Sequence, residues 1–124
     1  MQNRKLRNLI TFITGIFILS SCTSDYIVPE PSPPSGAQVS YATQIQPYFN
    51  SNCISCHATG SDAPDLTEGK SYQALMSMNL VNTATPEKSR LYEKINTGGS
   101  MNQHSTVAGN KLVLSWIQQG AKNN

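Results

Sequence analysis

The sequence predicts an all-α domain of about four short helices joined by loops. In four stretches, apolar residues recur at the three- and four-residue spacing of one helix face: 40–52, 70–78, 87–96 and 107–119. Glycine, proline, serine and aspartate gather instead in 58–69, and a Gly-Gly pair lies in 97–105. These two stretches therefore predict loops. No stretch alternates apolar and polar residues in the way that predicts a strand.

The first predicted helix, 40–52, has a clear start and an expected irregularity. Ser40 is a residue that caps helices well, and Pro47 predicts a kink or a new start because proline lacks a backbone N–H. Its expected buried face, which runs into the motif at residue 53, holds Tyr41, Ile45, Tyr48 and Phe49.

Each later helix has its own expected apolar face. Gly120 is a suitable stop for the last of them, since glycine favours the residue after a helix. The expected inward residues are Tyr72, Leu75, Met76 and Met78 in the second helix, Leu91, Tyr92 and Ile95 in the third, and Leu112, Val113, Trp116 and Ile117 in the fourth.

Residues 1–21 have the composition of a secretory signal. Three basic residues precede an apolar run over 9–19, and two serines follow it. That run is shorter than the roughly 20 residues that cross a bilayer core. A cleaved signal is therefore favoured over its alternative, a short membrane anchor helix.

The residues around Cys22 indicate how the exported chain is held. Leu19-Ser20-Ser21-Cys22 resembles the lipobox of bacterial lipoproteins, in which the cysteine is acylated and becomes the mature amino terminus. The resemblance implies a lipid anchor at Cys22, on the periplasmic side of the cell envelope, and the absence of aspartate after Cys22 favours the outer membrane. The alternative is an ordinary signal followed by a chance cysteine. Four prolines in 22–38 predict an extended tether.

The charge of the chain excludes one class of function. The whole sequence has a formal net charge of +2, but three of its nine basic residues lie in the signal. A chain that starts at Cys22 has six basic and seven acidic residues. No basic patch remains, and nucleic-acid binding is not expected. The predicted signal and tether leave residues 39–124 as a single folded domain.

The central motif is Cys53-Ile54-Ser55-Cys56-His57, the Cys-x-x-Cys-His signature of c-type haem attachment. Two thiols at this spacing can form thioethers with the two vinyl groups of one haem. The adjacent His57 can then ligate the iron. Cys53 and Cys56 are thus assigned to haem and Cys22 to lipid, which accounts for all three cysteines.

A second axial ligand is expected from one of four side chains: Met76, Met78, Met101 or His104. Met101 is favoured because it lies in a Gly-rich loop, where a side chain can reach the iron without breaking a helix. Met76 and Met78 are expected to fill the core, and His104 is the second choice. A thioether ligand favours ferrous iron and raises the reduction potential.

Several stretches resemble small class I cytochromes c, in particular the monohaem domains of bacterial exported and lipid-anchored proteins. They lie in the family's order: 45–57, Ala63-Pro64-Asp65-Leu66, Ser89-Arg90-Leu91-Tyr92, and Trp116 to Ala121. The resemblance implies a class I cytochrome c fold, with first and last helices crossing at Phe49 and Trp116. It also implies that the Pro64 carbonyl accepts a hydrogen bond from the His57 ring, that Leu66 packs on the haem, and that Met101 is the distal ligand.

These features predict an electron carrier and not an enzyme: a membrane-anchored monohaem cytochrome c that exchanges electrons with other envelope redox proteins. The first alternative is a haem sensor or peroxidase-like protein with an open or weakly held sixth iron site. The second is a zinc or dithiol module at Cys53 and Cys56. It is disfavoured because zinc needs four spaced ligands, and a thioredoxin-like site needs a βαβ context.

Overall fold

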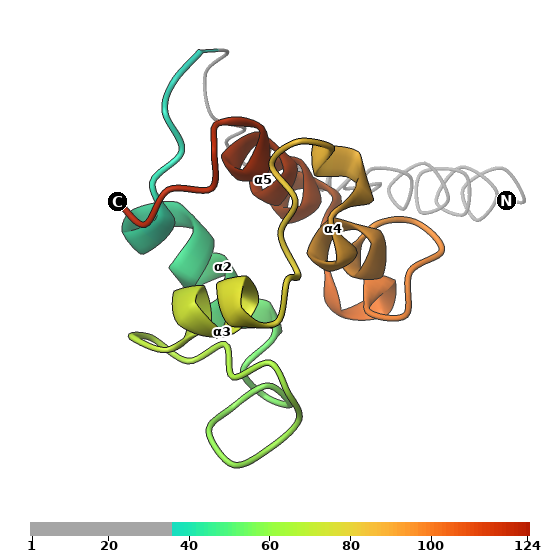
Figure 1. Cartoon of the computed structure of the whole chain (residues 1–124). Helices are drawn as coiled ribbons and strands as arrows, with labels where there is room; N and C mark the ends of the chain where they lie inside the picture. The colour runs from blue at the N-terminus through green and yellow to red at the C-terminus, as the bar shows by residue number, and fades with distance from the viewer. Residues whose placement is uncertain (1–35) are drawn as a thin grey trace, which may run out of the picture.

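The computed structural model describes residues 36–124, and every element in this range is helical (Figure 1). The predicted signal, Cys22 and most of the tether lie outside the described residues. Four α-helices and three single turns follow one another, with no strand among them: η1 (Tyr41–Ile45), α2 (Gln46–Asn52), α3 (Ser71–Ser77), η2 (Pro86–Lys88), α4 (Arg90–Ile95), η3 (Asn102–His104) and α5 (Val107–Gln118). The all-α prediction is confirmed.

The predicted first helix is present as two joined segments. The Ser40 side chain accepts a hydrogen bond from the Thr43 N–H and caps the start. The first segment, η1, is a π-helical turn, and it passes into α2 at Gln46, one residue before Pro47. The irregularity predicted at this proline is therefore present as a change of helix type, while the backbone stays helical through it. A proline in the first turn of α2 costs no helical hydrogen bond, because the first N–H groups of a helix have no partner within it.

The other helices depart from the predictions in three places. The helix predicted over 87–96 is divided at Ser89, which is extended and buried. Its hydroxyl accepts from the Asn82 N–H (2.9 Å) and donates to the Asn82 carbonyl (3.2 Å), which holds it out of the helix. The loop predicted over 97–105 contains the turn η3. Met78 was expected inside but is 42% exposed, because α3 ends at Ser77.

Tyr41 is the centre of the aromatic core. Its ring centroid lies 5.2 Å from that of Trp116 and 6.4 Å from that of Phe49. The expected contact between the first and last helices is therefore made through Tyr41 and not by a direct Phe49–Trp116 pair. The prediction missed this because spacing shows which residues are buried but not which ring fills the gap between two helices.

A second contact joins α2 directly to α5, at Tyr48 and Gly109. A Cβ atom placed on Gly109 would overlap the Tyr48 ring, so only glycine allows this approach. Next to it, the Tyr48 hydroxyl donates to Asn110 Oδ1 at 3.2 Å. The helix that leads into the Cys-x-x-Cys-His motif is thus fixed directly to the last helix.

No helix within residues 36–124 is both long enough and apolar enough to span a bilayer.

We expect Gly109→Ala to destabilise the domain by about 1–3 kcal/mol, the usual cost of an added group in a packed core. The methyl group would push Tyr48 away and weaken its hydrogen bond to Asn110. Urea unfolding of the apoprotein, followed by Trp116 fluorescence, measures the change. Lys111→Ala, an exposed position on the same helix, is the control and should stay within about 0.5 kcal/mol of the parent. A Gly109→Ala protein as stable as the parent would contradict this packing.

Candidate cofactor attachment site

The Cys-x-x-Cys-His motif follows α2 without a break and closes on itself in one turn. The Cys53 N–H donates to the Phe49 carbonyl (2.8 Å), and the His57 N–H donates to the Cys53 carbonyl (3.0 Å). Cys53 packs against the core and is half-buried, whereas Cys56 is exposed. Both are free thiols on a single turn, which is the arrangement needed to react with two substituents on the edge of one planar group.

Burial alters the chemistry of the first thiol. It raises the pKa of Cys53 from 9.0 to about 11, because a charged thiolate is poorly solvated there. Cys53 is therefore a neutral thiol at physiological pH, and we expect it to react with alkylating reagents more slowly than the exposed Cys56 does.

The His57 ring is oriented by a backbone carbonyl, but not by the expected one. Nδ1 lies 3.1 Å from the Asp62 carbonyl oxygen, so the prediction that the Pro64 carbonyl is the partner is wrong for this structure. The reason is a tight loop: the Asp62 N–H donates to the Cys56 carbonyl (3.1 Å) and turns residue 62 back towards the ring. When Nδ1 carries the proton and donates it to this carbonyl, the Nε2 lone pair is available to a metal.

The loop after the motif returns to the core at Leu66. Its N–H donates to the His57 carbonyl at 2.8 Å, and its side chain is only 4% exposed. Gln46 Nε2 donates to the Leu66 carbonyl at 3.0 Å. The Leu66 backbone is thus bonded to His57, and the packing of its side chain on a haem stays a prediction. Pro64 is partly buried in the same loop.

A buried polar network supports the loop that contains Leu66. Tyr41 donates to the Ser71 hydroxyl at 2.7 Å, and Ser71 in turn donates to Gln46 Oε1. Burial raises the pKa of Tyr41 to about 12, which keeps this hydroxyl a donor at all physiological pH values. The network joins η1, α2 and α3, so the loop that contains Leu66 rests on three helical segments.

Asp65 holds the outer part of the same loop. It accepts hydrogen bonds from the Thr67 hydroxyl (2.6 Å) and backbone N–H (3.0 Å) and from the Thr59 hydroxyl (2.7 Å). Lys70 Nζ lies 3.6 Å from its carboxylate. These donors, above all Thr67 and Thr59, lower the pKa of Asp65 from 3.8 to about 2.

Met101 lies on a second segment, which is tied to the end of α4. The Met101 N–H donates to the Lys94 carbonyl at 2.8 Å. Gly99 approaches the same place so closely that a Cβ atom would overlap the carbonyls of Glu93 and Lys94. The backbone of this loop is therefore fixed, while the Met101 side chain is 38% exposed.

Asn110 of α5 supports the far side of the Met101 loop. Its Nδ2 donates to the Ile95 carbonyl (2.8 Å) and to the Ser105 hydroxyl (3.2 Å). Since Asn110 also accepts from Tyr48, it joins the helix before the motif to the loop that carries Met101. His104 is exposed, with its Nε2 3.1 Å from Gln103 Nε2.

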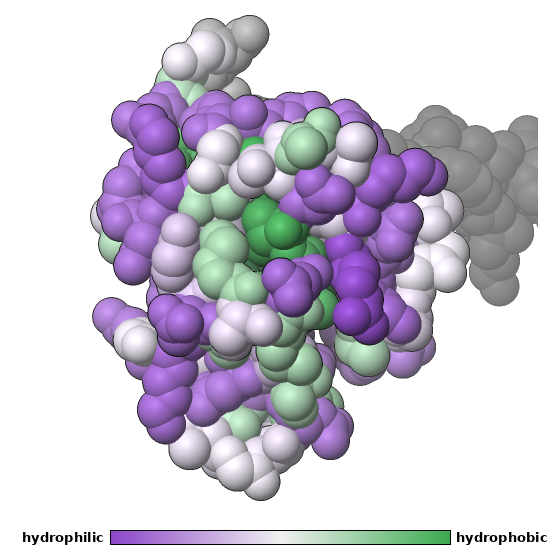
Figure 2. All heavy atoms as spheres, viewed as in Figure 1, coloured by the Kyte–Doolittle hydropathy of each residue, from purple (hydrophilic) through white to green (hydrophobic). Residues whose placement is uncertain are grey.

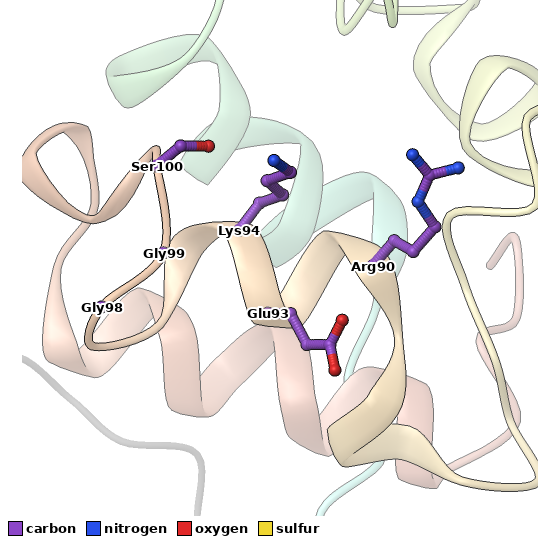
Figure 3. Close-up of a pocket in the computed structure, with 6 residues that line it drawn as sticks. All are labelled: Arg90, Glu93, Lys94, Gly98, Gly99 and Ser100. Carbon is purple, nitrogen blue, oxygen red and sulfur yellow. The ribbon is translucent and has the colours of Figure 1, made fainter.

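A small pocket next to Met101 is lined by two basic side chains that the sequence reasoning missed. It has a volume of about 400 Å³ and is lined by Arg90, Glu93, Lys94, Gly98, Gly99 and Ser100. In Figure 3, Arg90, Lys94 and Ser100 extend to the same side of α4, and Glu93 extends to the other. Within the described part of the chain, neither cation forms an ion pair. The sequence does contain a signal for this pair, because Arg90 and Lys94 are four residues apart and therefore lie on the same face of a helix.

Apolar surface is gathered on one face of the domain. Figure 2 shows green, hydrophobic atoms in the middle of this face, with purple, hydrophilic atoms around them. Partly buried hydrophobic residues that pack on the core include several beyond the helices: Cys53, Ile54, Leu80 and Val81. Two thiols and an oriented imidazole form a donor set that fits an iron-containing planar group, and two of the motif's residues, Cys53 and Ile54, are half-covered and pack against the core.

Nowhere in residues 36–124 do three or more His, Cys, Asp or Glu side chains gather in a way that can hold a metal ion. The zinc alternative needs four such ligands and gains no support in this part of the chain.

Comparisons of the chain with protein-family models, with curated proteins and with solved structures found no significant match.

We expect Asp65→Asn to lower the free energy of unfolding of the apoprotein at pH 7. A carboxylate whose pKa is lowered on folding stabilises the folded state above its unfolded pKa, here 3.8, and loses this effect as the pH falls through about 2. The difference between parent and variant should therefore shrink as the pH falls from 4 to 2. Urea unfolding at a series of pH values measures it, with Asp62→Asn, an exposed carboxylate of the same loop, as control. A difference that does not change with pH would contradict the assignment.

Proposed function

We propose that residues 39–124 form a c-type cytochrome domain of the class I type, with one haem attached through Cys53 and Cys56. The observation that carries the proposal is the Cys-x-x-Cys-His turn itself, with the His57 Nδ1 held by the Asp62 carbonyl. A histidine held in this way offers Nε2 to iron in a fixed orientation. The bound haem would supply a one-electron couple, and the domain would act as an electron carrier.

The chain's own residues have separate roles in this proposal. Cys53 and Cys56 fix the position of the haem, and His57 is the proximal ligand. Leu66, held between the His57 carbonyl and Gln46, packs beside the ring and excludes water. The Asp62 carbonyl takes the orienting role that the family resemblance gave to Pro64.

Met101 is the proposed distal ligand. Its backbone is fixed by Lys94 and Gly99, yet its side chain is 38% exposed and is therefore free to turn towards a bound group. Histidine and methionine ligation would leave no open iron site and would favour the ferrous state. His104, the alternative, is exposed and lies on the same loop.

Arg90 and Lys94 are the proposed partners of the haem carboxylates. A haem has two carboxylate groups, and carboxylates close to a protein core are stable when cations or other donors are near. The pocket formed by Arg90, Lys94 and Ser100 adjoins Met101 through the hydrogen bond between the Met101 N–H and the Lys94 carbonyl. These side chains would bind the haem carboxylates at the edge of the ring.

The proposed setting is the bacterial cell envelope. The lipobox resemblance at Cys22 supports a lipid anchor on the periplasmic side, with the outer membrane favoured, and residues 22–38 would be the tether. The partners would be other envelope redox proteins that give or accept one electron.

We expect the double variant Cys53→Ala, Cys56→Ala to lose all covalently bound haem. Each single variant should keep at most one thioether and yield less holoprotein. The measurement is haem retained after acid-acetone extraction, with the protein matured beside the cell's haem-ligation machinery. Cys22→Ala, which leaves the motif intact, is the control and should retain its haem. A parent protein that is colourless, with both motif thiols open to alkylation, would refute the proposal.

We expect Met101→Ala to lower the reduction potential of the holoprotein and to open the iron to added cyanide or imidazole, because a thioether ligand raises the potential and fills the sixth site. Redox titration and visible spectra measure both effects. Met78→Ala, another exposed methionine, and His104→Ala are the controls and should resemble the parent. A change in His104→Ala alone would make His104 the ligand. A parent that already binds cyanide rapidly would favour the sensor or peroxidase-like alternative.

A further inference from the structure

Gln119, just beyond α5, binds the backbone at the start of the domain. The Val39 N–H donates to Gln119 Oε1 at 2.7 Å, and Gln119 Nε2 donates to the Ala37 carbonyl at 3.1 Å. One amide side chain thus pairs with two backbone groups in the way that a neighbouring strand does. Two bonds of this kind fix both the position and the direction of residues 37–39. We call this pairing the Gln119 bridge.

Two further sets of contacts hold residue 39 and the start of the first helix. The Val39 side chain is 2% exposed and belongs to the core, so the segment is fixed from inside as well as at the surface. The last residue, Asn124, accepts hydrogen bonds from the Ala42 N–H (2.9 Å) through its carbonyl and from the Tyr41 N–H (3.0 Å) through its side chain. The start of the first helix is therefore enclosed by the C-terminal residues.

The fixed segment and the attachment motif lie at opposite ends of one helical rod. Residues 37–39 precede η1, and Cys53 follows α2. In Figure 1 the cyan segment leaves at the top of the molecule, while the green loop that follows the motif lies at the bottom. The rod of Tyr41 to Asn52 has 12 residues, a length of about 18 Å at the usual rise of an α-helix.

We propose that the Gln119 bridge, together with Val39, sets the point from which the N-terminal segment leaves, so that the attachment motif faces away from the membrane. This inference rests on the proposed function, since it takes Cys22 as the anchor and the motif as the haem end. The end of the domain that carries Cys53 to His57 is then accessible to a water-soluble redox partner and faces away from donors dissolved in the lipid. Without the bridge, the N-terminal segment can run along the domain and let the motif turn towards the lipid.

Hydrogen exchange of the full chain tests the bridge. In Gln119→Ala the Val39 amide loses its acceptor, and we expect its exchange to become about tenfold faster or more. Gln118→Ala is the matched control: its side chain is also exposed but bonds to Glu87, at 3.2 Å, and its removal should leave Val39 protected. Equal Val39 protection in Gln119→Ala and the parent would overturn the bridge.

Spin labels on the holoprotein in lipid vesicles test the orientation. Ser61→Cys places a label on the loop after the motif, and Lys122→Cys places one beside the start of the first helix; both positions are exposed. With nickel-chelating lipids in the vesicles, we expect stronger relaxation at residue 122 than at residue 61, and a smaller difference when Gln119→Ala is added. Equal or stronger relaxation at residue 61 in the parent would overturn the inference.

The anchor is tested separately in the same experiment. Cys22→Ala should abolish relaxation at both labels, because the domain leaves the vesicles. If the full chain with Cys22 present shows no relaxation at either label, the proposed anchor is refuted, and the orientation with it. Relaxation that depends on Cys22 but is equal at the two labels would leave the anchor standing and refute the orientation alone.

Discussion

The contact of Tyr48 with Gly109 and Asn110 is the interaction on which both halves of the candidate site depend. Tyr48 is five residues before Cys53, and Asn110 holds both ends of the loop that carries Met101, at the Ile95 carbonyl and at Ser105. A single helix crossing therefore sets the distance between the two segments from which iron ligands are proposed to come. Glycine at residue 109 is required for this because any side chain there would push Tyr48 away.

In this small domain, buried hydrogen bonds define the conformation of the loops, which a larger hydrophobic core does in bigger domains. The helices have at most 12 residues, and short helices are not stable alone. Among residues 36–124, four polar side chains are buried, and each bonds to another segment of the chain: Gln46, Ser71, Ser89 and Asn110. Since an unpaired buried polar group costs more than a satisfied one contributes, each of these residues permits one loop conformation and excludes its alternatives. The loops are therefore defined although they contain little regular structure.

The sequence predicted well what depends on local pattern. Apolar spacing located all four helical stretches, Ser40 and Pro47 marked the start and the change within the first, and Gly120 marked the end of the last. The sequence-based prediction failed where contacts between residues far apart in the chain determine the local structure. The Ser89–Asn82 pair divides a helix, Tyr41 stands between Phe49 and Trp116, and the Asp62 carbonyl takes the place given to Pro64. The role of Met101 stays a prediction, because neither spacing nor the described contacts bring it to His57.

The two ends of the first helical rod divide the functions proposed for the chain. One end carries His57 and the two thiols, with Cys56 exposed and with Cys53 and Ile54 packed against the core. The other carries Val39, the Gln119 bridge and the residues that bind Asn124, and its backbone groups are bonded to the C-terminal segment. A tether that left near the motif would compete with the cofactor and with partners for the same apolar surface. Because the bridge holds residues 37–39 at the opposite end, the proposed tether would leave uncovered the part of the surface through which electrons are proposed to pass.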